Sequence, residues 1–175
     1  MASIGHVAVG MAVGRYEAGL SSRGRLAASM LLFSALAMLP DADVIAFKLG
    51  IPYSAPWGHR GATHSLVFAA LVALGVTGLA RLLRLSPWRT GLLALLAVAS
   101  HGLLDSLTDG GLGVALLWPF SNERFFAPLH PLPVAPIGTR MFSSRGMYVV
   151  AFEFIAFIPF WAFALWPRRR AAREP

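Results

Sequence analysis

The strongest chemical signal in the sequence is a histidine and an aspartate four residues apart. These are His101 and Asp105, in the segment Ser-His-Gly-Leu-Leu-Asp-Ser. Residues four apart share one face of an α-helix, so the imidazole and the carboxylate can bind one ion. Imidazole with carboxylate suits Zn, Mn or Fe better than Mg or Ca, and the chain contains no cysteine. The pair therefore predicts a divalent metal site, with Zn as the first choice and Mn or Fe as alternatives.

Two further polar motifs flank apolar segments. Asp41 and Asp43 follow one segment in Leu-Pro-Asp-Ala-Asp, and His-Arg-Gly-Ala-Thr-His-Ser, which carries His59, Arg60 and His64, opens the next. The imidazoles and carboxylates are candidate metal ligands, and Asp41 is also a candidate general base. Arg60 suits recognition of a phosphate or a carboxylate, and a lipid head-group contact is the competing interpretation.

His6, Asp109 and Glu153 are conditional candidates. His6 joins the metal ligands if the first apolar segment brings it to the same end of the bundle. Asp109 lies on the same helix face as His101 and Asp105 if the helix extends that far, and it is then a second candidate general base. The alternative is that Asp109 belongs to a turn before Gly110-Gly111. Glu153 would pair with a buried Arg or His, or support a ligand. For Asp41, which follows a proline, a helix cap or turn is also open.

Apolar side chains dominate the composition. The 175 residues are 57% hydrophobic and 13% charged, whereas soluble domains average ~45–50% apolar and ~25% charged. This excludes intrinsic disorder and argues against an ordinary soluble domain. The net charge of +7 points to anionic lipid head groups, and no nucleic-acid-binding signature is present.

Five apolar segments must position the polar motifs. They predict an all-α fold, a small multi-pass membrane helix bundle with about four spanning helices and a short N-terminal helix. We expect residues 1–175 to form a single membrane-embedded domain. The segments cover residues 4–14, 26–39, about 63–85, 90–107 and 147–166.

The arginines give the bundle an orientation. If the last four segments each cross once, ten arginines fall on one side, which the positive-inside rule makes cytoplasmic. The C-terminus, with residues 168–175 as a basic tail, is then cytoplasmic, and the His and Asp motifs meet near the outer face. The ten are Arg15, Arg23, Arg25, Arg81, Arg84, Arg89, Arg168, Arg169, Arg170 and Arg173.

The ordered motifs resemble the YdjM/YbcI-type family of bacterial inner-membrane proteins, which are regarded as metal-dependent hydrolases. The resemblance covers nearly the whole chain and is carried by Leu39-Pro-Asp-Ala-Asp, Gly58-His-Arg-Gly-Ala-Thr-His-Ser, His101-Gly-Leu-Leu-Asp, Trp118-Pro-Phe-Ser-Asn-Glu-Arg-Phe-Phe and Pro131-Leu-Pro-Val-Ala-Pro. It implies a location in the inner membrane and a distant relation to zinc-dependent phospholipase C. It also implies a ligand set of His6, Asp43, His59, His64, His101 and Asp105.

These observations lead to a functional hypothesis. We expect a membrane-bound metal-dependent hydrolase that cleaves a phosphate ester or another ester of an anionic lipid or lipid-linked substrate. Asp41 or Asp109 would act as general base, and Arg60 would hold the anionic group. The alternatives are a non-catalytic metal-binding or transport protein, a stress or assembly factor, and a bundle that metal stabilises without chemistry. Membrane lipids are the expected partners.

Overall fold

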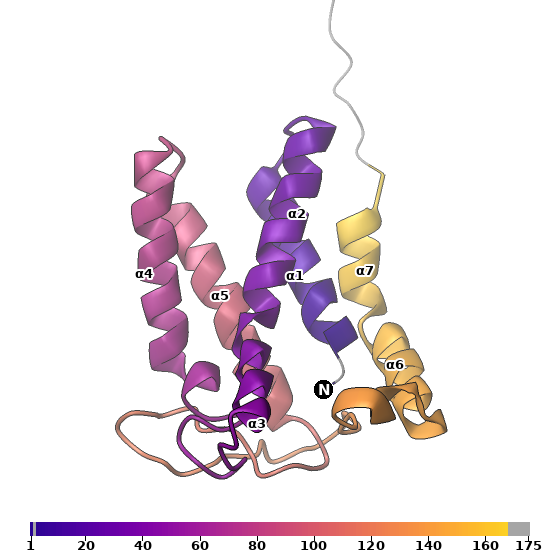
Figure 1. The fold of residues 1–175 in the computed structure, drawn as a ribbon. Helices are drawn as coiled ribbons and strands as arrows, with labels where there is room; N and C mark the ends of the chain where they lie inside the picture. Colours follow the sequence, from indigo (N-terminus) through magenta and orange to yellow (C-terminus); the bar gives the residue numbers. More distant parts are fainter. Residues whose placement is uncertain (2, 168–175) are drawn as a thin grey trace, which may run out of the picture.

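The structure is a computed structural model that describes residues 1 and 3–167. Long helices stand side by side and the long loops gather at one end (Figure 1). The upright helices are α1 (Ser3–Ala18), α2 (Arg23–Met38), α4 (Leu66–Leu82), α5 (Pro87–Ser106) and α7 (Ile158–Leu165). The remaining elements are the helices α3 (Ile45–Lys48) and α6 (Ser144–Ala156) and the 3-10 helices η1 (Leu39–Val44), η2 (Ala62–His64) and η3 (Gly138–Phe142). Residues 1 and 3–167 contain no strand, which confirms the all-α expectation.

Local sequence signals set the helix starts. The hydroxyl oxygen of Ser65 accepts a hydrogen bond from the Phe68 N–H, and that of Ser22 accepts one from the Arg25 N–H. Each serine thereby satisfies an N–H group that the first helical turn leaves without a partner. α5 instead begins with Pro87, whose fixed φ suits the first helical position.

Alanine is the commonest buried apolar residue in the bundle, and most large apolar side chains face outward, with Phe33 a buried exception. Ala8, Ala37 and Ala94 are fully buried, whereas Leu74 and Leu82 are 65% and 81% exposed. A water-soluble domain buries its leucines, whereas membrane helices pack through small residues and leave large apolar ones facing lipid. The distribution of side chains is therefore that of a membrane protein.

α1 and α2 pack unusually closely. A Cβ atom at Gly10 would lie 2.5 Å from the Ser34 Cα, and one at Gly14 would lie 2.5 Å from the Ser29 backbone oxygen. This Gly-xxx-Gly spacing lets the two backbones meet. α1 continues to Ala18 and matches α2 in length, so the expectation of a short helix limited to residues 4–14 is corrected.

Fewer helices meet the length and hydropathy criteria for a membrane span than the sequence predicted. Within residues 1 and 3–167, one helical stretch, Arg23–Lys48, is long and apolar enough to cross a bilayer, with a mean hydropathy of 1.7. α6 and α7 meet the criterion only as one span bent by 61°. α4 is apolar but has 17 residues. Four spans therefore stay a prediction.

The two ends of the bundle differ in chemistry. The α1–α2 and α4–α5 connections lie at the upper end in Figure 1, together with the end of α7. The N-terminus and the long loops lie at the opposite end. The arginine-rich connections are thus separated from the His and Asp motifs by the length of the bundle. The predicted tail, 168–175, falls outside the described residues.

Candidate metal centre

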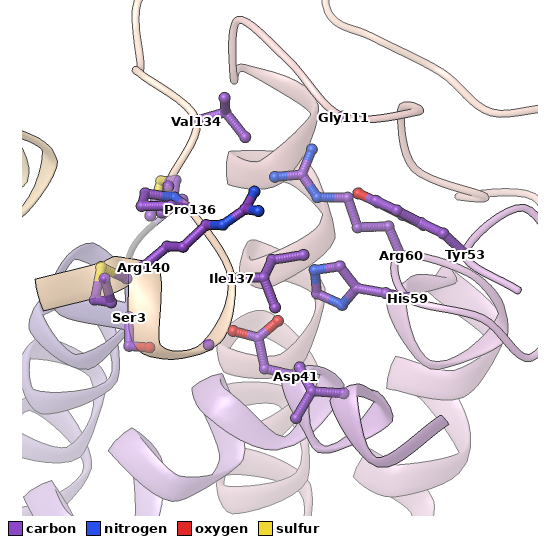
Figure 2. Close-up of a pocket in the computed structure, with 15 residues that line it drawn as sticks. Ser3, Asp41, Tyr53, His59, Arg60, Gly111, Val134, Pro136, Ile137 and Arg140 are labelled. Carbon is purple, nitrogen blue, oxygen red and sulfur yellow. The ribbon is translucent and has the colours of Figure 1, made fainter. Parts of the chain in front are cut away.

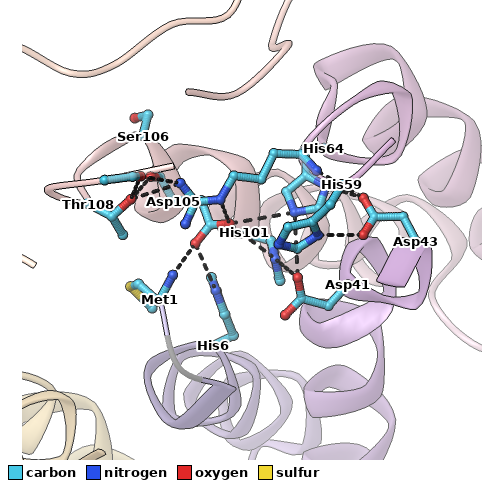
Figure 3. A network of polar contacts seen from close by, with 12 residues as sticks. Met1, His6, Asp41, Asp43, His59, His64, His101, Asp105, Ser106 and Thr108 are labelled. Carbon is cyan, nitrogen blue, oxygen red and sulfur yellow. Dashed lines mark hydrogen bonds and ion pairs between the residues drawn. The ribbon is translucent and has the colours of Figure 1, made fainter. Parts of the chain in front are cut away.

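Four side chains converge at the loop end of the bundle from three separate elements. Asp41 comes from η1, His64 from η2, and His101 and Asp105 from the last turns of α5 (Figure 3). One ligand atom of each lies within 4.8 Å of the others. His64, His101 and Asp105 are buried, and Asp41 is partly exposed. The structure thus brings together residues that are up to 64 positions apart in the sequence.

The separations within this group fit a metal ion better than hydrogen bonds. His101 Nε2 lies 3.3 Å from Asp41 Oδ1 and 3.9 Å from Asp105 Oδ2. His64 Nε2 lies 3.6 Å from each of the same two oxygens. A tetrahedral Zn ion with bonds of ~2.0–2.1 Å holds its ligand atoms roughly 3.3–3.4 Å apart. The four atoms therefore frame a space of the right size for one such ion.

Hydrogen bonds on the far side of each ring set the histidine tautomers. His101 Nδ1 lies 2.7 Å from the Ala37 carbonyl oxygen, which only accepts, so the proton is on Nδ1. His64 Nδ1 lies 3.1 Å from both Asp43 Oδ2 and Thr63 Oγ. Both Nε2 atoms are buried without a hydrogen-bond partner. A buried imidazole nitrogen with a directed lone pair and no partner is what a metal ligand requires.

Asp43 and His59 form a second group with His64, and its geometry differs. Asp43 Oδ1 lies 2.7 Å from His59 Nδ1, and Asp43 Oδ2 accepts hydrogen bonds from the Thr63 hydroxyl at 2.7 Å and the Arg60 backbone N–H at 3.2 Å. These are hydrogen-bond lengths. The contacts favour Asp43 as the carboxylate that orients His59 and His64. Both groups remain able to hold a metal by their ligand types.

His6 stands beside the four-residue group. Its ring stacks on His101 with centroids 3.6 Å apart and an interplanar angle of 7°. His6 Nε2 lies 3.6 Å from Asp105 Oδ1, and neither ring nitrogen has a hydrogen-bond partner. The amino group of Met1 lies 2.7 Å from the same oxygen. The predicted ligand His6 therefore reaches the centre through the other oxygen of Asp105.

Arg60 is a buried cation of this cluster. Its Nε lies 3.1 Å from Asp105 Oδ2, and one terminal nitrogen donates to the Thr108 hydroxyl at 2.9 Å and the Gly110 carbonyl at 3.1 Å. Its φ of 61° is in the left-handed region, which a non-glycine residue adopts at an energetic cost. The surrounding contacts hold the strained residue and fix its guanidinium beside the carboxylates.

Charge in the cluster favours a bound cation. Burial alone would lower the pKa of His64, but Asp105, Asp41 and Asp43 outweigh burial and raise the pKa to about 10. Three carboxylates around one buried imidazole thus attract positive charge. Either a proton on His64 or a metal ion can supply it, and the two compete.

A cavity of about 490 Å³ opens next to the cluster. Figure 2 shows Asp41, His59 and Arg60 lining it, with Arg140 of η3 entering from the opposite side. Tyr53 also lines it, and burial raises the pKa of its hydroxyl. Two guanidinium groups, those of Arg60 and Arg140, thus line a cavity that lies beside the candidate metal ligands.

Asp109 does not join the centre. α5 ends at Ser106, where the Thr108 hydroxyl and backbone N–H both donate to the Asp105 carbonyl oxygen. The helical stripe therefore stops before Asp109. The Asp109 carboxylate is exposed and accepts a hydrogen bond of 2.6 Å from the Val134 N–H. The turn interpretation describes this residue, and the structure gives no support to its role as a general base.

Some residues of the site carried no signal in the sequence. Tyr53 lies in a loop and Arg140 in the short 3-10 helix η3, and neither shares a periodicity with the long helices. Thr63 directly precedes His64, and its hydroxyl could have been suspected from the motif. Arg140 could not, because it is 80 positions from Arg60 and only tertiary folding brings the two together.

Glu153 supports the centre from α6. Its Oε2 accepts a hydrogen bond of 3.1 Å from the Gly5 N–H, one residue before His6, and the side chain is fully buried. A carboxylate from one helix thus caps the first turn of α1, whose N–H groups have no partner within the helix.

We expect Glu153→Leu to weaken the protein. Loss of the acceptor leaves a buried N–H unsatisfied, at a cost of about 1–3 kcal/mol, and loosens the His6 end of α1. Thermal unfolding in detergent should show a lower Tm than wild type. Glu153→Gln, which keeps an oxygen acceptor, is the matched control and should unfold closer to wild type. Equal Tm values for the leucine variant and wild type would contradict this capping role.

Comparison with known proteins identifies the family. The family model described as YdjM inner membrane protein matches residues 1–171. The chain belongs to the YdjM inner membrane protein family. It is also 45% identical over 144 residues to the inner membrane protein YbcI of Escherichia coli (strain K12), a match that covers 81% of this chain and 80% of YbcI. No solved structure matches. The resemblance predicted from the motifs is confirmed, and the family places the protein in the inner membrane.

Proposed function

We propose that this protein is a membrane-bound metal-dependent hydrolase acting on an anionic ester, such as a phosphate ester, of a lipid or lipid-linked compound. The observation that carries the proposal is the pair of buried Nε2 atoms, of His64 and His101, which face two carboxylates at 3.3–3.9 Å and have no hydrogen-bond partner.

The metal would be held by His64, His101 and Asp105, with Asp41 beside the position left open for water and with His6 and His59 close by. Zn is the first candidate, because nitrogen and oxygen donors at tetrahedral spacing are its usual set, with Mn or Fe as alternatives. A divalent metal there supplies Lewis-acid chemistry, activating water and polarising the ester.

The chain's own residues do the remaining work. Arg60 and Arg140 hold the anionic group in the cavity. Asp41, the partly exposed carboxylate of the group and part of the cavity wall, accepts the proton of the attacking water. The new bond forms from the water oxygen to phosphorus, the ester oxygen leaves, and that oxygen takes up the proton from Asp41.

A transport path is supported less well. Such a path needs polar groups through the depth of the bundle. Glu153 lies inside the last apolar segment, and its carboxylate accepts a hydrogen bond from the Gly5 N–H. The polar side chains of the metal centre and of the cavity gather at the loop end instead. The arginine-rich opposite end suggests that the centre faces the outer side of the membrane and the C-terminus the cytoplasm.

Elemental analysis tests the proposal. Detergent-purified wild type should contain about one or two equivalents of Zn, Mn or Fe, and His101→Ala should lose this metal because it removes one of the three protein ligands. The metal-loaded wild type should then hydrolyse phosphate esters, with the chelated protein as the control. A wild type that takes up no metal on reconstitution, or a His101→Ala variant with full metal content, would refute the assignment.

A further inference from the structure

An apolar groove of about 550 Å³ runs between α1 and α2. Ser34 is its one hydroxyl-bearing lining residue, and that hydroxyl donates to the Val7 carbonyl oxygen at 3.4 Å. Three methionines give the groove flexible walls that adapt to an apolar ligand. The lining residues are Val7, Met11, Ala27, Met30, Leu31, Ser34, Ala35 and Met38.

The groove and the cavity at the metal centre are lined by neighbouring turns of the same two segments of the chain. On α1, Ser3 lines the cavity and Val7, one turn later, lines the groove. At the end of α2, Met38 lines the groove. In η1, which follows directly, Asp41 and Val44 line the cavity, so the three residues are spaced at intervals of three. Residues three or four apart share a helix face. The same two faces therefore form the groove in the bundle and the polar cavity at its end.

We propose that this groove binds one hydrocarbon chain of a membrane lipid whose phosphate head group lies in the cavity. The proposal deepens the proposed function, on which its assignment of the head group rests, by naming where the lipid part of the substrate binds. The substrate class becomes a lipid that enters sideways from the bilayer, with its head at Arg60 and Arg140.

The size and charge of the two compartments support this occupant. From Ala27 to Met38 the groove extends roughly 16 Å along α2, at ~1.5 Å per residue. This is about half of the ~30 Å hydrocarbon core, the depth of one leaflet. At the cavity end, two guanidinium groups complement a phosphate. An apolar trough one leaflet deep that leads to a cationic cavity matches the two halves of an anionic lipid.

Photocrosslinking tests the proposal without relying on turnover. The probe is phosphatidic acid with a diazirine on one acyl chain, presented to the metal-loaded protein in phosphatidylcholine vesicles. Mass spectrometry should find Met11, Met30 and Leu31 labelled on the order of tenfold more by this probe than by the same diazirine on phosphatidylcholine. Unlabelled long-chain phosphatidic acid should abolish the difference, and glycerol phosphate should not.

A groove-filling variant and a matched control sharpen the test. Ala35 lines the groove and Ala70 of α4 does not, and both are exposed. Ala35→Trp should remove the excess groove labelling while the variant retains its metal, and Ala70→Trp should label as wild type does. Equal labelling of the groove and α4 by both probes, or no competition by long-chain phosphatidic acid, would overturn the proposal. Groove labelling without any ester hydrolysis would refute the hydrolase alone, and hydrolysis without groove labelling would refute the groove alone.

Discussion

Asp105→Asn should abolish both metal binding and ester hydrolysis. Asp105 Oδ2 belongs to the four-atom group, lies 3.1 Å from Arg60 Nε, and shares its carboxylate with the contact to His6. Loss of a residue that merely supports a ligand costs ~10–100-fold in metal affinity, so loss of this ligand should cost more. Elemental analysis and hydrolysis assays on the purified variant are the measurements.

The same variant should also be less stable. Asparagine keeps the shape of the side chain but leaves the buried Arg60 guanidinium without its carboxylate, which typically costs about 3–5 kcal/mol. The Tm of the metal-free variant should therefore fall below that of metal-free wild type. This comparison separates the ion-pair effect from the stabilisation that a bound metal gives.

Asp109→Asn is the control for this experiment. Asp109 follows α5 four residues after Asp105, is exposed, and accepts its hydrogen bond from Val134, a role that an asparagine oxygen can also fill. We expect wild-type metal content and hydrolysis. If Asp109→Asn lost hydrolysis and Asp105→Asn kept it, the assignment of roles from the structure would be reversed.

The sequence was most informative where the spacing was local or the topology simple. The His101 and Asp105 pair depends only on helix geometry, and both residues fall on the buried face of α5. The prediction that Asp41, His64 and His101 lie close together depends only on the apolar segments beginning or ending at the same end of the bundle. The helices themselves follow from long apolar segments with serine or proline starts.

The sequence failed where side-chain capping or tertiary packing decides. The helical stripe of His101 and Asp105 does not continue to Asp109, because α5 ends at Ser106 and the Thr108 hydroxyl donates to the Asp105 carbonyl oxygen, so of the two interpretations the turn is the one that the structure supports. The different surroundings of Asp41, which lies 3.3 Å from His101 Nε2, and Asp43, which lies 2.7 Å from His59 Nδ1, depend on a difference in distance of less than 1 Å. Arg140 reaches the cavity only through the fold of a long loop.

Gly102→Ala is the second substitution with a large expected effect. A Cβ atom at this position of α5 would lie 2.4 Å from the His64 backbone oxygen, and a carbonyl in a tight 3-10 turn cannot rotate away as a side chain can. The 3-10 turn η2, which carries His64, would have to move away from α5, which carries His101. Because metal binding depends on the positions of both Nε2 atoms, we expect metal affinity to fall by about 10–100-fold.

A glycine elsewhere in the bundle provides the control. Gly78 lies in α4, and a Cβ atom there would meet nothing within 4 Å. Gly78→Ala should therefore bind metal as wild type does, and its helix should gain up to ~1 kcal/mol in propensity. Metal titrations of Gly102→Ala and Gly78→Ala, measured side by side, test whether only the first substitution lowers the metal affinity. Wild-type affinity in Gly102→Ala would mean that the close contact between α5 and the His64 turn does not set the metal geometry, and that His64 contributes little to binding.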